Sequence, residues 1–254
     1  MRPLAWASRR ALSAASPAWA LRVVTVAPAL WTTCSWRSIW PPSAPTDEYG
    51  AAYRVRDMAA DGIAVLDALG VRRAHVMGLS MGGMIVQTMA IEHPTRIASV
   101  TSVMSTTGDP SVGQAAPEVL GVLLSPPATT REAYIEESPK WMAWQSKKYQ
   151  DAERTKQLAA IGWDRSNYGE GGPRQMAAIV SSGDRTERLR QLDVPALVIH
   201  GRDDTLITPS GGFATADAIP GAHLLFLSDM GHDMPEPLWP VIVGAVATLT
   251  QSSK

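Results

Sequence analysis

The feature that most constrains this chain is a serine flanked by glycines, GLSMG at residues 78–82. The short apolar stretch before it, residues 74–77, is typical of a buried strand. The stretch after it, residues 81–93, has the pattern of a helix, and Pro94 is a stop signal. The sequence therefore predicts a strand that turns sharply into a helix at a serine.

Such a turn is a nucleophile elbow, which holds its serine in a strained, exposed position. The residues two before and two after the serine approach each other closely, so Gly78 and Gly82 are expected because glycine has no Cβ. Ser80 is then the candidate nucleophile, and the backbone N–H of Met81 is a candidate oxyanion-hole donor at the helix N-terminus. A glycine-rich turn with a capping serine, or a phosphate-binding loop, is the alternative interpretation.

A serine hydroxyl needs a base to take its proton, and histidine suits that role near neutral pH. His232 lies in a loop, residues 230–235 (MGHDMP), directly after the last predicted strand. Open α/β sheets place their sites at this edge. We therefore predict that His232 is the base. The other four histidines fall within strands, at a helix end or at a strand start: His75, His93, His200 and His223.

The acid that orients the histidine should also follow a strand, between serine and histidine in chain order. Residues 196–200 form a predicted strand, and Gly201 and Arg202 lead to two adjacent aspartates, Asp203 and Asp204. The position of this loop alone does not choose between them.

Strand patterns alternate with helical patterns over most of the chain, which predicts an α/β fold with a mostly parallel, doubly wound sheet. The alternation lapses over residues 106–190, which we interpret as a helical cap insertion in a core formed by residues 51–105 and 191–254. Helical patterns within the insertion are expected at residues 117–124, 131–145, 151–161 and 174–181.

Residues 1–50 form an atypical N-terminal segment. The first 46 residues hold five arginines, five of the nine tryptophans, and no lysine, aspartate or glutamate. Ser8, Arg9 and Arg10 precede an apolar stretch, so an exported protein with an arginine-containing leader is the alternative to the cytoplasmic location that we expect.

The net charge and the single cysteine exclude several classes of binding partner and cofactor. A formal net charge of -1 provides no basic stripe for a nucleic acid, and no apolar run is long enough for a membrane span. Cys34 is the single cysteine, so the chain offers no cysteine cluster for a metal. We expect a small-molecule substrate, and we expect neither a metal nor an organic cofactor.

Residues 53–97 and 192–241 resemble the α/β-hydrolase superfamily, in its serine esterase and lactonase branch. The resemblance rests on the order and spacing of the serine motif, of Gly201 to Asp204, and of the Gly231-His232 pair. It implies that Asp204, three residues after Gly201, is the orienting acid, and that the insertion lines the substrate pocket. Residues 102–110 (SVMSTTGDP) are further similar to bacterial methyl esterases that act on polyketides.

The chain departs from this family near its start, where a glycine-rich turn should complete the oxyanion hole. No glycine precedes Gly50, so we expect the opening strands to be missing, with residues 21–26 as the family's fourth strand. A degenerate, non-catalytic protein is therefore the alternative to an active hydrolase. In the insertion, Trp141 and Trp144 are either pocket residues or the core of the cap.

Overall fold

The computed structural model describes residues 23–26, 50–126, 128–165 and 171–252. Its strands are β1 (Val23–Val26), β2 (Ala74–Leu79), β3 (Ile97–Val103), β4 (Ala196–Gly201) and β5 (His223–Leu227). Its α-helices are α1 (Val55–Ala68), α2 (Met81–Glu92), α3 (Pro117–Leu123), α4 (Arg131–Glu137), α5 (Ala152–Arg165), α6 (Gly171–Ser182), α7 (Thr186–Leu189), α8 (Pro209–Ala218) and α9 (Trp239–Ser252). Short 3₁₀ helices are η2 (Pro94–Arg96), η3 (Ser138–Ala143), η4 (Lys147–Tyr149) and η5 (Glu236–Leu238).

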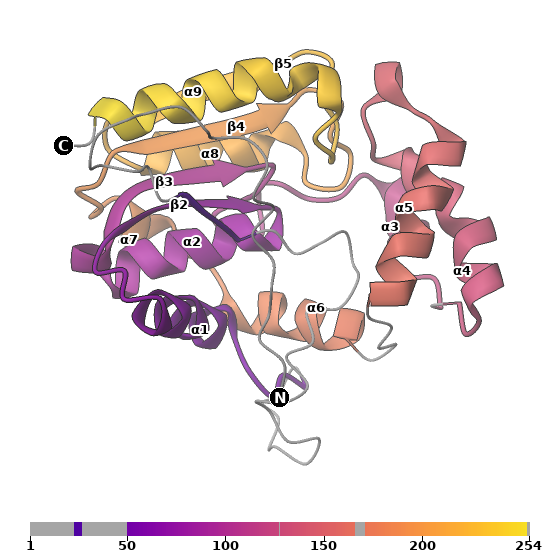
Figure 1. The fold of residues 1–254 in the computed structure, drawn as a ribbon, viewed down its shortest axis with the longest axis horizontal. Helices are drawn as coiled ribbons and strands as arrows, with labels where there is room; N and C mark the ends of the chain where they lie inside the picture. The colour runs from indigo at the N-terminus through magenta and orange to yellow at the C-terminus, as the bar shows by residue number, and fades with distance from the viewer. Residues whose placement is uncertain (1–22, 27–49, 127, 166–170, 253–254) are drawn as a thin grey trace.

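The five described strands form one parallel sheet in the order β1-β2-β3-β4-β5, which confirms the predicted fold class. In this register Gly78, near the end of β2, lies between Val26 of β1 and Ser102 of β3. Because the strands are parallel, all their carboxyl ends meet at one edge of the sheet. Figure 1 shows that this edge faces α3, α4 and α5.

Helices cover both faces of the sheet (Figure 1). Strand order follows chain order, so right-handed crossovers place α1, α2 and α8 on the same face. The last helix, α9, follows β5 and packs against β3 and β4 from the opposite face.

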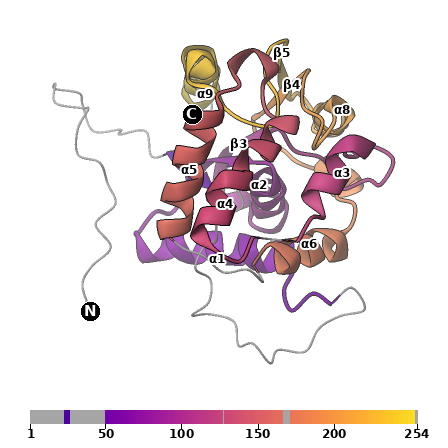
Figure 2. The ribbon, with the colours of Figure 1, turned by 90° about the vertical axis from the view of Figure 1, so that its right-hand side faces the viewer.

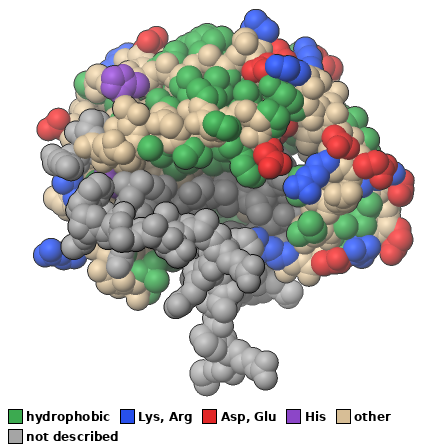
Figure 3. All heavy atoms as spheres, turned by 45° about the horizontal axis from the view of Figure 1, so that its top comes forward, with side chains coloured by type: hydrophobic (Ala, Val, Ile, Leu, Met, Phe, Trp, Pro, Cys, Tyr) green, Lys and Arg blue, Asp and Glu red, His purple; other side chains and the backbone are tan. Residues whose placement is uncertain are grey.

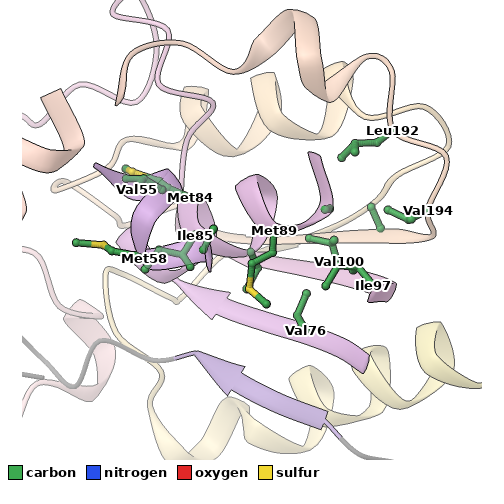
Figure 4. Packing of buried hydrophobic residues seen from close by; sticks show 14 of the residues in the cluster. Val55, Met58, Val76, Met84, Ile85, Met89, Ile97, Val100, Leu192 and Val194 are labelled. Carbon is green, nitrogen blue, oxygen red and sulfur yellow. The ribbon is translucent and has the colours of Figure 1, made fainter. Parts of the chain in front are cut away.

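The core divides into two layers that follow the alternation of side chains along each strand. Val76 of β2 and Val100 of β3 belong to the layer under α1 and α2, where Met89 of α2 is fully buried (Figure 4). Met77, the neighbour of Val76, belongs to the layer under α9. One apolar strand can serve both layers because its successive side chains point to opposite faces.

The outer surface of α9 is unusually apolar for a helix at the surface. Trp239, Val241 and Val243 are all exposed, and Figure 3 shows apolar side chains gathered on this side of the molecule. No helix in the described ranges is long and apolar enough to cross a membrane.

Helices α3, α4 and α5 stand together outside the carboxyl edge of the sheet, with η3 between α4 and α5 in the chain (Figure 2). The helical pattern predicted over residues 131–145 corresponds to two elements, since α4 ends at Glu137 and the chain continues as the 3₁₀ helix η3 to Ala143. The α-helix ends before Pro139 because proline lacks the N–H donor that the next α-helical hydrogen bond requires, while Ser138 before it keeps helical dihedral angles. We propose that residues 106–190 form the cap, although α6 packs against α1 and α7 against α2 and α8.

The two ends of the insertion meet at a neck, formed by residues 106–108 and 183–185. The buried guanidinium of Arg185 donates to the carbonyls of Thr106 (3.0 Å) and Gly183 (3.2 Å), and the backbone N–H of Arg185 donates to Thr107 (2.9 Å). Burial lowers the pKa of Arg185 to about 10, an effect that Asp184 partly opposes, so the group stays charged at neutral pH. Gly108 has φ of 91° and packs so closely on the Gly183 carbonyl that a Cβ there would overlap it.

The predicted fourth strand corresponds to β1, which pairs with β2 along one edge of the described sheet. Among the described residues, no strand pairs with the other side of β1. The remaining predictions for residues 1–22 and 27–49, including the leader, fall outside the described residues.

Candidate active site

Ser80 occupies the turn between β2 and α2, as the motif predicts. Its φ of 55° and ψ of -121° lie in a region that residues other than glycine rarely adopt. The backbone N–H of Ser80 donates to the carbonyl of Val103 (2.8 Å), which ties the turn to the end of β3. The side chain is therefore lifted out of the sheet by strain that the neighbouring strand maintains.

Glycine is required around this turn for steric reasons. A Cβ on Gly78 would overlap the backbone carbonyl of Gly82, so the two elbow glycines touch as predicted. Gly83, for which the sequence suggested no role, is a third such position. A Cβ there would lie 2.5 Å from the Cβ of Ser105 in the loop after β3.

The N-terminus of α2 lies directly behind Ser80. The N–H groups of Gly83 and Met84 donate to the Ser80 carbonyl (2.9 and 3.4 Å) and close the first turn. Met81 is the first residue of α2, and the leading N–H groups of a helix have no carbonyl partner within it. This placement suits the Met81 N–H to a negative charge that develops beside Ser80.

His232 connects Ser80 with Asp204. Its Nε2 lies 2.9 Å from the Oγ of Ser80, and its Nδ1 lies 2.7 Å from Oδ2 of Asp204. The three residues follow β2, β4 and β5, whose carboxyl ends share one edge of the sheet. An ionised carboxylate only accepts hydrogen bonds, so Nδ1 carries the proton and Nε2 is free to accept the serine proton.

Asp204 is buried yet well supplied with hydrogen-bond donors. Its Oδ1 accepts from the backbone N–H groups of Leu206 and Ile207, both at 2.9 Å. Burial alone would raise the pKa of Asp204, but the charges and hydrogen bonds of His232 and His200 outweigh burial and hold the pKa below its usual 3.8. The ionised form therefore stabilises the fold above pH 3.8, and this contribution is lost as the pH falls through the lower pKa of the folded state.

The neighbouring residues have other contacts. Asp203 is 3.9 Å from the Nε of Arg202, and its own N–H donates to the Met230 carbonyl at 2.9 Å. His200 is fully buried, donates from Nε2 to the Ile207 carbonyl (2.8 Å) and lies 3.4 Å from Oδ2 of Asp204. A histidine that the sequence suggested was structural thus supports the acid loop.

The sequence did not suggest a role for two further residues near the site, Ser146 and Asp233. Ser146, in the cap, contacts both neighbours of His232: its Oγ donates to Asp233 and accepts from the N–H of Gly231 (2.8 Å). Ser146 lies 87 residues before Asp233, and no motif connects the two. Only the adjacency of Asp233 to the histidine was a visible signal.

Of the two tryptophans predicted as pocket or cap-core residues, Trp144 is buried in an apolar cluster and Trp141 is half-buried against it. Trp144 is 3% exposed and packs with Val119 and Leu206. The ring of Trp141 meets that of Tyr134 edge-on, with centroids 5.1 Å apart. Their role in lining a substrate pocket stays a prediction.

Other features of the described chain lie away from Ser80. A surface hollow of about 440 Å³ is bordered by Arg73, Pro94 and Val194, which precede β2, β3 and β4. It therefore opens at the amino ends of the strands, opposite the edge that carries the serine. Among the described residues no group of three or more His, Cys, Asp or Glu side chains is arranged to hold a metal ion.

A parallel sheet with a serine at a strand-to-helix turn, and with a histidine and an aspartate after later strands, defines the α/β-hydrolase class. The sequence model of the family described as alpha/beta hydrolase fold matches residues 33–236. The chain belongs to this family, and it is a hydrolase.

Several relatives bear out this assignment. Rhodomycin D methylesterase DauP of Streptomyces sp. (strain C5) is 29% identical over 226 residues, which cover 79% of this chain and 74% of that protein. A 2-hydroxy-6-oxononadienedioate/2-hydroxy-6-oxononatrienedioate hydrolase of Cupriavidus pinatubonensis (strain JMP 134 / LMG 1197) is 28% identical, covering 76% of this chain and 66% of that protein. Among solved structures, the enol-lactonase from Burkholderia xenovorans LB400 is similar in fold, with a TM-score of 0.57, 24% identity and coverage of 82% and 74%.

The steric argument at the elbow gives a first testable prediction. Gly78→Ala should destabilise the protein by about 1–3 kcal/mol or more, because the new Cβ overlaps a backbone carbonyl that cannot rotate away. Gly121→Ala in α3 is the matched control, since a Cβ there has no neighbour within 4 Å apart from the adjacent residues and backbone of its own helix. Urea unfolding of both variants measures the difference. Equal stability of the two would contradict the close contact between the elbow glycines.

Proposed function

We propose that this chain is a serine hydrolase that cleaves a carboxylic ester or lactone of a small molecule through an acyl-Ser80 intermediate. The observation that carries the proposal is the unbroken hydrogen-bond chain from Ser80 through His232 to Asp204. Nucleophile, base and orienting acid are each within 2.9 Å of the next group, which is the reach that proton transfer requires.

In the first half of the reaction, the Oγ of Ser80 attacks the carbonyl carbon while Nε2 of His232 takes the hydroxyl proton. The carbonyl oxygen becomes an oxyanion, for which the Met81 N–H is one donor. Asp204 stays ionised and stabilises the imidazolium, since its pKa is already depressed in the folded protein. Collapse of the tetrahedral species expels the alcohol, which takes the proton from His232, and leaves Ser80 acylated.

In the second half, His232 removes a proton from water, and the hydroxide adds to the acyl carbon. The second tetrahedral species breaks at the bond to Ser80, whose Oγ recovers the proton from His232. The carboxylic acid leaves and the enzyme returns to its starting state. The same residues serve a lactone, in which the alcohol and acid remain parts of one molecule.

The substrate class rests on relatives as well as on geometry. The methylesterase DauP covers most of this chain, and the similarity at residues 102–110 favours the same branch. We therefore favour an ester or lactone of a small molecule over a polymer or nucleic acid. The cytoplasmic location stays a prediction, and so does the loss of the glycine-rich turn that would supply a second oxyanion donor.

A fluorophosphonate probe tests the nucleophile without knowledge of the substrate. We expect the probe to attach to Ser80, and Ser80→Ala to abolish both labelling and aryl ester turnover, because the triad acts as a unit. Peptide mass spectrometry locates the modified residue. Labelling of another serine would refute the assignment, and an unlabelled but folded wild type would favour the degenerate, non-catalytic protein.

Adjacent aspartates provide a matched pair for the acid. Asp204→Asn should reduce kcat by about three to four orders of magnitude, because an amide cannot hold the histidine in the same tautomer. Asp203→Asn, one residue away and 3.9 Å from Arg202, should stay close to wild type. Steady-state turnover of an aryl ester checks both variants. Inactivation by Asp203→Asn alone would show that the acid is misassigned.

The cap tryptophans are tested by separating stability from specificity. Because the half-buried Trp141 packs on Tyr134 and the apolar cluster of the cap, Trp141→Ala should lower stability by less than the ~3–5 kcal/mol typical of a fully buried tryptophan, without altering preference among acyl chain lengths. The ratio of kcat/KM for short and long acyl esters gives the preference, and thermal unfolding gives the stability. A changed ratio would establish that Trp141 lines the pocket.

A further inference from the structure

The loop that carries His232 is bound to the cap by three consecutive residues. The N–H of Gly231 donates to the Oγ of Ser146 at 2.8 Å, and the N–H of His232 donates to the Trp144 carbonyl at 2.7 Å. One oxygen of Asp233, Oδ1, accepts from both the backbone N–H (2.9 Å) and the hydroxyl of Ser146. Cap residues 144–146 therefore contact the histidine and both of its neighbours.

Ser146 has a complete set of partners in this contact. Its side chain is fully buried, and its single hydroxyl donates in one direction and accepts in the other. Removing the hydroxyl would leave the buried N–H of Gly231 without that acceptor, which is costly for a backbone donor. The serine is therefore a specific link and not a space-filling residue.

The contact also leaves little room for movement. A Cβ on Gly231 would lie 2.5 Å from both the carbonyl carbon of Gln145 and the backbone N of Ser146. Glycine thus allows the cap backbone to rest directly on the histidine loop. Further links nearby join the same regions, since Asp229 binds the Nζ of Lys148 (2.8 Å) and the hydroxyl of Tyr149 (2.6 Å).

Building on the proposed function, we propose that Ser146 is a positioning residue that holds His232 in line with Ser80. The cap segment fixes the backbone on both sides of the histidine, and the 2.9 Å distance from Nε2 to Ser80 depends on that backbone. A displacement of about 1 Å near a reacting group can reduce rate about a hundredfold. Placement of the cap and activation of the serine are therefore coupled through Ser146.

The test compares Ser146→Ala with Ser138→Ala. Ser138 is also a fully buried cap serine, but its hydroxyl donates locally to the Ile135 carbonyl at 2.7 Å. We expect Ser146→Ala to lower kcat and the rate of fluorophosphonate labelling by roughly ten- to a hundredfold, with KM little changed, because alignment and not binding is lost. Ser138→Ala should leave both rates near wild type. A folded Ser146→Ala protein with the kcat of Ser138→Ala would overturn the proposal.

Two variants of Asp233, the carboxylate that Ser146 binds, test the same contact independently. They decide whether the contact positions His232 if Ser146→Ala does not fold. Asp233→Asn keeps the Oδ1 acceptor and should retain most activity, whereas Asp233→Ala loses it and should match the loss expected for Ser146→Ala. The double variant Ser146→Ala/Asp233→Ala should be little worse than either single one, because both remove the same link. Full multiplication of the two losses, or equal activity of the two Asp233 variants, would refute the link.

A spectroscopic readout separates failure of this proposal from failure of the proposed function. The proton between His232 Nδ1 and Asp204 should give a low-field NMR resonance, which Ser146→Ala should shift or broaden and Ser138→Ala should not. If the wild type neither labels nor turns over esters, the proposed function fails, and the resonance alone decides the positioning role. An unchanged resonance in Ser146→Ala would overturn that role.

Discussion

The structure depends on one steric constraint, the positive φ of Ser80 at the turn between β2 and α2. A residue with a side chain in this conformation costs of order 1–3 kcal/mol and persists only where its surroundings leave no alternative. Here β2 is hydrogen-bonded on both sides, α2 is buried along most of its length, and the Ser80 N–H is bound to β3. The strain at the serine is thus held by a buried helix and by strands paired on both sides.

Two carboxylates flank the histidine, and their surroundings shift their pKa values in opposite directions. The pKa of Asp204 is lowered, since the charges and hydrogen bonds of His232 and His200 outweigh burial. The pKa of Asp233 is raised, because burial outweighs the hydrogen bonds from Ser146 and the charge of His232. Two neighbouring carboxyl groups whose pKa values are shifted in opposite directions take different roles. We assign the electrostatic role to Asp204 and a tethering role to Asp233.

The features that depend on short stretches of sequence could be predicted. The strand-turn-helix around Ser80, the loop position of His232 and the parallel sheet all follow from periodicity, glycine spacing and chain order. The choice of Asp204 over Asp203 required family resemblance, because both follow the same strand. The helical character of residues 131–143 was predicted, and the change from α-helix to 3₁₀ helix could have been read from Pro139 itself. The contact of Ser146 with Asp233 was not readable, because it joins segments 87 residues apart that carry no shared pattern.

The neck beneath the cap has an evolutionary consequence. The Arg185 guanidinium and backbone bind mostly main-chain carbonyls, so the junction places few demands on the sequence of the intervening segment. Loop-closure entropy grows slowly, by about 0.6 kcal/mol for each doubling of length. A lineage built on this junction is therefore free to vary the outer parts of the segment between Gly108 and Gly183, provided that residues 144–146 keep their contact with the histidine loop and α6 keeps its contact with α1. Length and sequence of the outer segment can then change while the contacts of the sheet and of the histidine loop are retained.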